Sequence, residues 1–221
     1  MNTGGYPAPG APDSPTQYEA WYAAPRGAWI AEREYRLLNR LLQPEPGTTL
    51  LDVGAGTGQF ARRHAANGLQ VTGLDPDQTS LLHAHSLAPE LTWLAGDAQK
   101  LPFADRSFDY CGAVTSLCFV PDPARALHEM WRVARRGVVL GLLHRPSRLH
   151  RLKAGRGGYR GARWDHRRAV AEWFQGLPGN PRPRFGWAVF LPGGGLIARR
   201  LEPIIPAHVP LGGFMAVAAH H

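Results

Sequence analysis

The chain has 221 residues, a formal net charge of +8 and two cysteines. A chain of this length buries a hydrophobic core without disulfide bonds and fits one large domain. No apolar run reaches the ~18 residues that a transmembrane helix needs, and the first residues lack the apolar stretch of a signal peptide. We therefore predict a cytoplasmic protein with a disordered leader at 1–17 and a single domain at 18–221.

The side chains that bind metals do not form a recognisable site in the sequence. Cys111 and Cys118 lie in one apolar stretch and are interpreted as core residues. The ten histidines are scattered, and the His-x-Glu, His-Glu-x-x-His and Cys-x-x-Cys spacings of zinc sites do not occur. We expect no metal site and a metal-free reaction.

The apolar pattern predicts helices and strands in alternation. Residues 28–42 carry apolar side chains at a spacing of three to four, which is typical of an amphipathic helix, and we expect a helical cover at 18–46. Short apolar runs bounded by turn residues then alternate with helix-compatible stretches, which indicates a parallel sheet with helices on both faces, a doubly wound α/β fold. The expected strands are 49–53, 69–74, 91–94, 107–114, 137–143, 185–191 and 211–219. The further expected helices are 59–66, 77–87, 123–134 and 166–174.

A glycine-rich loop follows the first expected strand. Its alternate glycines, Gly54, Gly56 and Gly58, allow a tight turn and let a ligand approach the backbone. A dinucleotide-binding loop would place the third glycine one residue later, where this chain has Gln59. Asp52 at the strand end would repel a pyrophosphate but suits a cationic ligand such as S-adenosylmethionine. The loop residues expected at the ligand are Gly54, Ala55, Gly56, Thr57, Gly58 and Gln59.

Two further carboxylates follow the next strands. Asp75, with Pro76 after it, stands at the end of the second strand, where a carboxylate accepts hydrogen bonds from both ribose hydroxyls. Asp97 stands at the end of the third strand between Gly96 and Ala98, where it could accept a hydrogen bond from the adenine amine. Each aspartate taken singly also fits a helix N-cap or a turn. Their occurrence at successive strand ends favours a ligand site.

Together these residues resemble a known family. The matching segments are Leu-Asp-Val-Gly-Ala-Gly-Thr-Gly at 51–58, Gly-Leu-Asp at 73–75, Gly-Asp-Ala at 96–98, Leu-Pro-Phe-Ala-Asp-Arg-Ser-Phe-Asp at 101–109 and Glu-Met-Trp-Arg-Val-Ala-Arg-Arg-Gly at 129–137. They resemble the class I S-adenosylmethionine-dependent methyltransferases, in the methyltransferase type 11 branch that includes the ubiquinone and menaquinone biosynthesis C-methyltransferases. Where that family commonly has Lys-Pro-Gly before the fifth strand, this chain has Ala-Arg-Arg-Gly at 134–137.

The resemblance implies a fold, a cofactor and several site residues. It implies a Rossmann-like fold with a seven-stranded, mostly parallel sheet, S-adenosylmethionine as cofactor and S-adenosylhomocysteine as product. The backbone around Thr115 and Ser116 would border the methionine moiety. A leading helix would fold over the cofactor, so that Tyr18 and Tyr22 wall the site and offer their rings to the sulfonium, although ordinary helix packing explains them equally well.

The reaction expected from these features is an in-line methyl transfer to a small molecule, for which positioning and exclusion of water supply much of the catalysis. His144, at the end of the fifth strand, is a candidate base for a phenolic or acidic-carbon acceptor. An acidic thiol would need no base, and a plain strand-end histidine remains the alternative.

The excess of positive charge is concentrated in one segment. Residues 145–168 contain nine basic residues and one acid, Asp165. We interpret 145–180 as a basic lid insertion that forms the acceptor pocket and selects an anionic small molecule. The segment at 145–168 also fits an anionic membrane surface or nucleic-acid phosphates, so a nucleic-acid-modifying methyltransferase stays an alternative. A non-catalytic binding module of the same fold is a second one, although it would not need the three aspartates. The acceptor and the oligomeric state are not specified.

Overall fold

A computed structural model describes residues 14–221, so most of the leader predicted at 1–17 lies outside the described residues. The prediction was wrong for residues 15–17, because helix α1 (Pro15–Ala23) begins at Pro15. The Ser14 hydroxyl accepts a hydrogen bond from the Gln17 backbone NH, and the proline occupies the first turn, where its missing NH costs nothing. A second helix, α2 (Pro25–Leu42), follows after a break at Ala24. The expected helical cover therefore consists of two helices.

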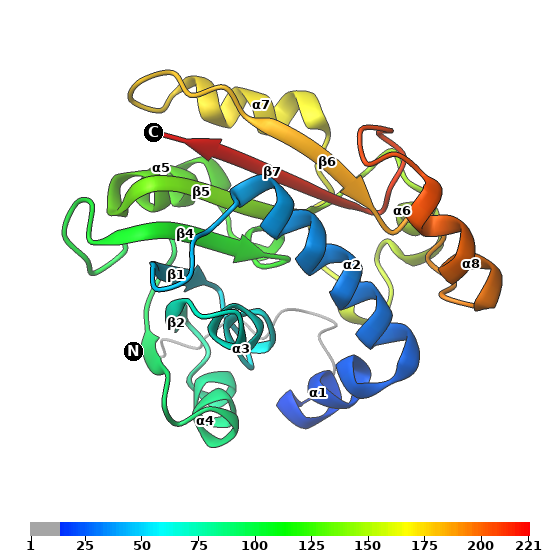
Figure 1. Ribbon diagram of the computed structural model, residues 1–221, viewed down its shortest axis with the longest axis horizontal. Helices are drawn as coiled ribbons and strands as arrows, with labels where there is room; N and C mark the ends of the chain where they lie inside the picture. The colour runs from blue at the N-terminus through cyan, green and yellow to red at the C-terminus, as the bar shows by residue number, and fades with distance from the viewer. Residues whose placement is uncertain (1–13) are drawn as a thin grey trace.

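Seven strands form one sheet in the order β3-β2-β1-β4-β5-β7-β6, which confirms the predicted doubly wound fold (Figure 1). The first five strands are parallel, and β7 is antiparallel to both β5 and β6. The strands are β1 (Thr49–Val53), β2 (Gln70–Asp75), β3 (Thr92–Ala95), β4 (Phe108–Val114), β5 (Ala134–Leu143), β6 (Arg184–Ala188) and β7 (Phe214–His220).

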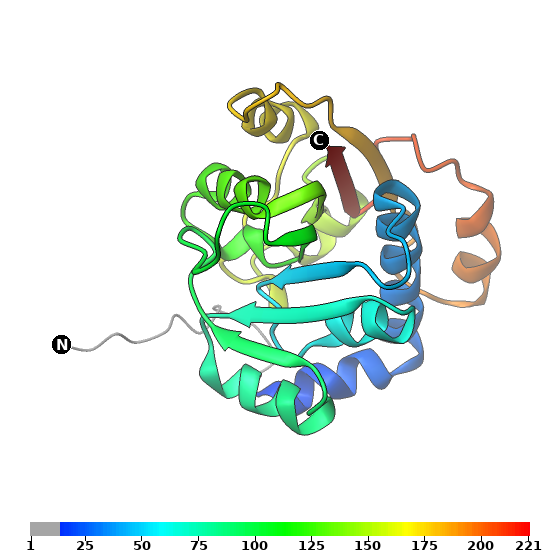
Figure 2. The same ribbon diagram turned by 60° about the vertical axis from the view of Figure 1, so that its left-hand side comes forward.

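Helices cover both faces of this sheet (Figures 1 and 2). One face packs against α2 and α3 (Gln59–Ala66), and the other packs against α5 (Pro123–Val133) and α7 (Arg167–Gln175). The remaining elements are α4 (Gln78–Leu87), α6 (Arg148–Lys153), α8 (Leu196–Leu201) and the short 3₁₀ turns η1 (Leu117–Phe119), η2 (Gly157–Tyr159) and η3 (Glu202–Ile204). Within residues 14–221 no helix has the length and apolar character needed to cross a membrane.

Most predicted bounds are correct to within a few residues, and the larger differences have backbone causes. Strand β6 ends at Ala188 rather than at 191 because Val189 adopts a φ of 61°, in the left-handed region that interrupts a strand. Strand β5 begins at Ala134, three residues early, because Ala134 pairs with Phe108 across an irregularity in the register with β4. Strand β7 begins only at Phe214.

Helix α2 carries much of the packing on its face of the sheet, because its apolar side chains enter the core formed with β5 and β7. Leu38 is fully buried there, whereas Leu82 on α4 is 66% exposed. Replacing Leu38 with Ala removes buried methyl groups and leaves a cavity, which costs about 2–5 kcal/mol.

We therefore expect Leu38→Ala to lower the free energy of unfolding by about 3 kcal/mol. Leu82→Ala is the matched control, since it makes the same change of helix propensity without loss of burial, and it should change the free energy by less than about 0.5 kcal/mol. Urea unfolding followed by circular dichroism measures both. Equal effects of the two substitutions would contradict this account of α2.

Candidate functional site

The carboxyl ends of β1, β2 and β4 meet at one edge of the sheet, because these strands are parallel neighbours. Strand β1 lies between β2 and β4. The strand order changes direction between β1 and β4, because β2 and β3 follow on one side of β1 and β4 and β5 lie on its other side. In open α/β sheets, ligands bind at such a change in strand order, outside the carboxyl ends of the strands. The structure brings the predicted glycine loop and the predicted aspartates to this edge.

The glycine loop is tied to its neighbours by backbone hydrogen bonds. The amides of Gly54 and Ala55 donate to the Leu74 carbonyl at 2.7 and 3.0 Å, which fixes the start of the loop against β2. All three loop glycines have a positive φ, between 54° and 81°. A Cβ at Gly54 would lie 2.3 Å from the Ser116 Cβ, whereas a Cβ at Gly56 would meet nothing within 4 Å. The backbone at Gly56 is therefore the part of the loop that is open to a ligand.

Asp75 is oriented by two backbone amides. Its two carboxylate oxygens accept hydrogen bonds from the Gly56 NH at 2.7 Å and the Asp77 NH at 2.8 Å. Each oxygen keeps a second lone pair for another donor. Burial raises the pKa of this carboxyl group, while the two amides oppose that rise.

Asp52 is the second carboxylate of this edge and is almost fully buried. Burial, with a further contribution from the nearby Asp75 carboxylate, raises the pKa of Asp52 to about 7. Among residues 14–221, neither carboxylate forms an ion pair. The site thus holds two neighbouring acids without a cation, which fits a positively charged ligand.

The residues predicted around the adenine lie after β3. Asp97 is exposed, and one of its carboxylate oxygens accepts a hydrogen bond from the Gln99 backbone NH at 2.9 Å, as in an aspartate turn. The Gly96 NH donates to the Asp75 carbonyl, which places the two strand ends side by side. Ala98 is buried, and Pro76 lies in the turn between β2 and α4.

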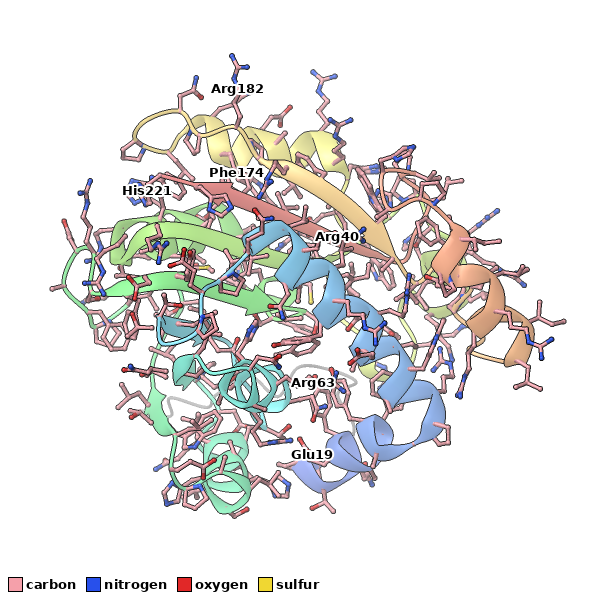
Figure 3. The ribbon with its side chains drawn as sticks, in the orientation of Figure 1. Glu19, Arg40, Arg63, Phe174, Arg182 and His221 are labelled. Atoms are coloured by element: carbon pink, nitrogen blue, oxygen red, sulfur yellow. The ribbon has the colours of Figure 1, made fainter. Side chains whose placement is uncertain are left out.

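Helix α1 is attached to the glycine loop by a carboxylate that the sequence analysis missed. Glu19, which projects from α1 (Figure 3), accepts hydrogen bonds from the Thr57 hydroxyl and, at 2.7 Å, from the Arg62 guanidinium in the first turn of α3. Arg62 also donates to the Thr57 carbonyl and to the Gln59 side chain. Nothing in the sequence singles out Glu19 except its place beside Tyr18.

The aromatic residues of α1 lie within electrostatic range of the buried carboxyl group of Glu34. The hydroxyls of Tyr18 and Tyr22 are 3.1 Å apart, and the Tyr22 ring packs edge-on against Phe60 of α3. Burial raises the pKa of Glu34, on α2, to about 8, with Arg63 opposing that rise. Burial, with a smaller contribution from the charge of Glu34, raises the pKa of Tyr18, Tyr22 and Tyr159. Sequence reasoning found the first two tyrosines but neither Glu34 nor Tyr159.

The backbone that follows β4 is strained at Thr115. Thr115 has a φ of 51°, which is unusual for a β-branched residue, and its NH donates to the Gly141 carbonyl of β5. The Ser116 hydroxyl donates to the Val53 carbonyl at 2.8 Å. These contacts hold the end of β4 against the end of β1, beside the glycine loop.

His144 is buried at the end of β5. Its Nδ1 lies 3.0 Å from the Gly212 carbonyl, which can only accept, so Nδ1 carries the proton and Nε2 is the nitrogen left to act as a base. Burial lowers its pKa, and its ring lies 5.8 Å from that of Trp187. The catalytic role of His144 stays a prediction.

The basic segment folds back onto the strand ends. Arg163 forms an ion pair with the buried Asp165 and donates to the carbonyls of Leu117 and Val120, which follow β4. Trp164 packs with Cys118 in a small apolar cluster at the same place. The first part of the predicted lid, residues 145–180, therefore contacts the elements that follow β4 and β5.

Comparison with known proteins points to one family. Residues 51–142 match the family model described as a methyltransferase domain. A demethylmenaquinone methyltransferase of Renibacterium salmoninarum is 42% identical over 92 residues, covering 42% of this chain and 39% of that protein. A malonyl-[acyl-carrier protein] O-methyltransferase of Erwinia pyrifoliae is 39% identical over 110 residues, covering 48% of this chain and 42% of that protein. The chain thus spans less than half the length of these two curated relatives.

Solved structures share the fold over most of the chain. A Thermotoga maritima S-adenosylmethionine-dependent methyltransferase, described as a possible histamine N-methyltransferase, superposes with a TM-score of 0.72 at 22% identity, covering 93% of this chain and 95% of that one. The [4+2]-cyclase SpnF superposes with a TM-score of 0.60 at 25% identity, covering 86% and 80% of the two chains. The motifs and the domain match agree, and residues 51–142 match a methyltransferase domain within a chain that shares its fold with these structures.

Proposed function

We propose that the protein transfers a methyl group from S-adenosylmethionine to a small-molecule acceptor by in-line displacement. The observation that carries this proposal is the pair of neighbouring acids, Asp52 and Asp75, which form no ion pair within residues 14–221, with Asp75 bound to the open backbone of Gly56. A buried carboxylate is costly unless an opposite charge or a hydrogen-bond donor compensates it. The cofactor, when bound, supplies an ammonium, ribose hydroxyls and the methyl group on a cationic sulfur.

The roles that we assign to the residues follow from their surroundings. Asp75, held by two amides, binds the ribose hydroxyls, and Asp52 compensates the positive charge of the methionine moiety. Asp97, with Gly96 and Ala98 beside it, borders the adenine. Thr115 and Ser116 line the methionine end of the site. Glu19 holds α1 over the loop, so that Tyr18 and Tyr22 exclude water from the reacting atoms.

The acceptor is approached from the ends of β4 and β5, beneath the basic segment at 145–168. A sulfonium transfers its methyl group without a protein nucleophile, so the chain has to position the acceptor and, for a phenol or carbon acid, to remove one proton. Nε2 of His144 is the proposed proton acceptor in that case. The relatives named as demethylmenaquinone and malonyl-[acyl-carrier protein] methyltransferases act on different acceptors, so they support the methyl transfer and leave the acceptor open.

A different reaction on the same fold is the second candidate, because the structurally similar SpnF is a cyclase. Incubation with methyl-labelled S-adenosylmethionine and a cell metabolite extract distinguishes the two candidates. Methyl transfer predicts a labelled product together with S-adenosylhomocysteine. Binding of the cofactor without any labelled product in extracts that contain the acceptor of a related methyltransferase would favour the second candidate.

The role of Asp75 predicts a loss of affinity. Asp75→Ala removes a carboxylate that accepts charge-assisted hydrogen bonds, so binding of S-adenosylhomocysteine should weaken by about 10- to 100-fold in calorimetry, corresponding to about 1.5–3 kcal/mol. Asp105→Ala is the control, since that carboxylate is 76% exposed and pairs with Arg132 away from the loop. Affinity unchanged by Asp75→Ala would refute the assignment.

The raised pKa of Asp52 predicts a pH-dependent affinity. In the free protein burial favours the protonated carboxyl group up to a pH of about 7, whereas the ammonium group of a bound ligand favours the carboxylate. Binding therefore releases a proton below this pH, and affinity for S-adenosylhomocysteine should rise by up to about tenfold per pH unit from pH ~5.5 to ~7. Calorimetry in buffers of different ionisation enthalpy measures the released proton.

Asp52→Asn is the control for this pH dependence, because an amide does not titrate. The variant should bind more weakly at neutral pH and should lose most of the rise in affinity between pH ~5.5 and ~7. An equally steep rise in Asp52→Asn would assign the titration to another group whose pKa burial raises, either the neighbouring Asp75 carboxyl or that of Glu34.

A further inference from the structure

The connection between β6 and β7, residues 189–213, exposes large apolar side chains to an unusual degree. Leu196, Ile197 and Ile204 are each more than 70% exposed, and Leu201 and Leu211 are also exposed. Half of the exposed large apolar side chains in residues 14–221 lie in this connection, which includes α8 and η3. Exposed apolar side chains gathered in one segment in this way favour an interaction site.

The exposed side chains belong to a segment that is held in place. Glu202 is fully buried and accepts hydrogen bonds from the backbone amides of Phe190 and Leu191 at 2.9 and 3.0 Å. Arg199 donates to the Pro25 carbonyl at the start of α2, and Arg26 donates to the Pro192 carbonyl. These contacts fix the connection to the body of the protein, while α8 projects from the molecule (Figure 1) and α6 borders the connection at Pro192 and Gly193.

The charge around this apolar surface is positive. Residues 145–213 contain thirteen Lys and Arg against three acids, of which Asp165 and Glu202 are buried. The basic side chains nearest the surface are exposed and form no ion pair within residues 14–221. They are Arg148, Arg151, Lys153 and Arg200.

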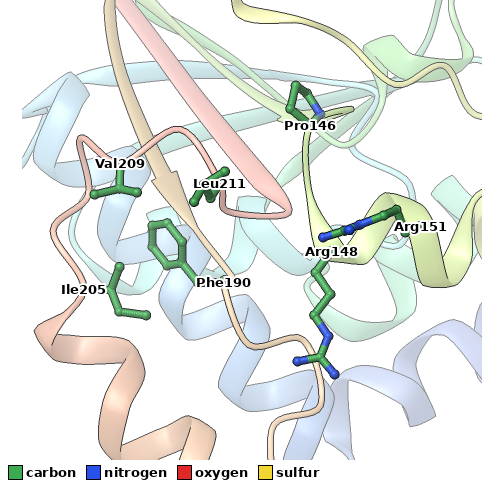
Figure 4. Close-up of a pocket in the computed structure, with 7 residues that line it drawn as sticks. All are labelled: Pro146, Arg148, Arg151, Phe190, Ile205, Val209 and Leu211. Carbon is green, nitrogen blue, oxygen red and sulfur yellow. The ribbon is translucent and has the colours of Figure 1, made fainter.

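Two hollows beside α6 combine the same two properties. A pocket of about 290 Å³ has apolar walls that include Phe190, Ile205 and Leu211, and Arg148 and Arg151 lie at its edge (Figure 4). A second hollow of about 380 Å³ is lined by Leu149, Leu152, Lys153, Arg26, Pro192 and Gly193. In each of the two hollows, basic side chains thus lie next to apolar ones.

Amphipathic surfaces with apolar side chains beside arginines and lysines bind the interface of anionic bilayers, because the apolar groups enter the acyl region while the cations meet the headgroups. A second copy of this chain is a less suitable occupant, since a two-fold interface on this surface would place like charges opposite one another. We propose that α8, η3 and α6 form a docking surface for an anionic lipid bilayer, with Leu196, Ile197 and Ile204 inserted at the membrane interface. This surface is separate from the cofactor site and does not depend on the proposed methyl transfer.

Vesicle sedimentation with the full chain tests the proposal. The protein should bind vesicles of phosphatidylcholine mixed with phosphatidylglycerol and should bind pure phosphatidylcholine vesicles much more weakly. Ile197→Glu places a charge in the inserting surface and should reduce binding to the anionic vesicles at least about tenfold. Arg200→Ala should reduce it by about fivefold and make it less sensitive to salt.

Leu82→Glu is the matched control, because Leu82 is exposed on α4 and lies outside this surface. It should leave vesicle binding unchanged, and circular dichroism should show that all variants are folded. Each variant should also retain its affinity for S-adenosylhomocysteine, a readout that reports on the cofactor site alone, so failure of one proposal is distinguishable from failure of the other.

Four results would overturn the docking surface. They are absence of binding to the anionic vesicles, undiminished binding by Ile197→Glu, equal loss of binding in Leu82→Glu, and concentration-dependent self-association that Ile197→Glu abolishes without any vesicle binding. The last result would assign the surface to a second copy. Binding of RNA that Arg200→Ala weakens and Ile197→Glu does not, in the absence of vesicle binding, would assign it to nucleic acid instead.

Discussion

The parallel pairing of β1 with both β2 and β4 is the constraint on which the site depends. Because the three strands run in one direction, each of them ends at the same edge of the sheet. Asp52, Asp75 and Ser116, which are far apart in the sequence, are neighbours only for this reason. The hydrogen bonds from the glycine loop to Leu74 and from Ser116 to Val53 then hold the three ends in register.

The carboxylates near the loop have different electrostatic roles. Glu19 is compensated by the Arg62 guanidinium and the Thr57 hydroxyl, and its contribution is to hold α1 in place. Asp52 and Asp75 have no such cation within the described part of the chain, and the proximity of two acids in a buried place disfavours their joint ionisation. A ligand that brings positive charge relieves this repulsion, so binding energy and ionisation are coupled at the site.

The glycine-loop edge and the segments after β5 therefore differ in charge. The loop edge is acidic and fits a cation, whereas the segments after β5 carry most of the positive charge. Some of this charge is structural, because Arg163 binds the buried Asp165 and the carbonyls after β4. Arg148, Arg151 and Lys153 of α6 and Arg200 of α8 have no such partners in residues 14–221, and they lie in segments that also expose leucine and isoleucine side chains. The basic residues after β5 thus fall into two groups, those that form structural contacts within the protein and those that face outward.

The alternation of helices and strands, the glycine loop and the acids at the strand ends could be predicted from the sequence, because each is a local pattern of periodicity, turn chemistry or spacing. The limits of these patterns are visible at β6, where Val189 leaves the strand conformation in an otherwise apolar run. The contact of Glu19 with Thr57 and the electrostatic effect of Glu34 on the tyrosines of α1 could not be predicted, since they join separate elements that only folding brings together. The same holds for the exposure of apolar residues. Leu38 and Ile197 both lie in helices, and their different burial depends on whether another element packs against them.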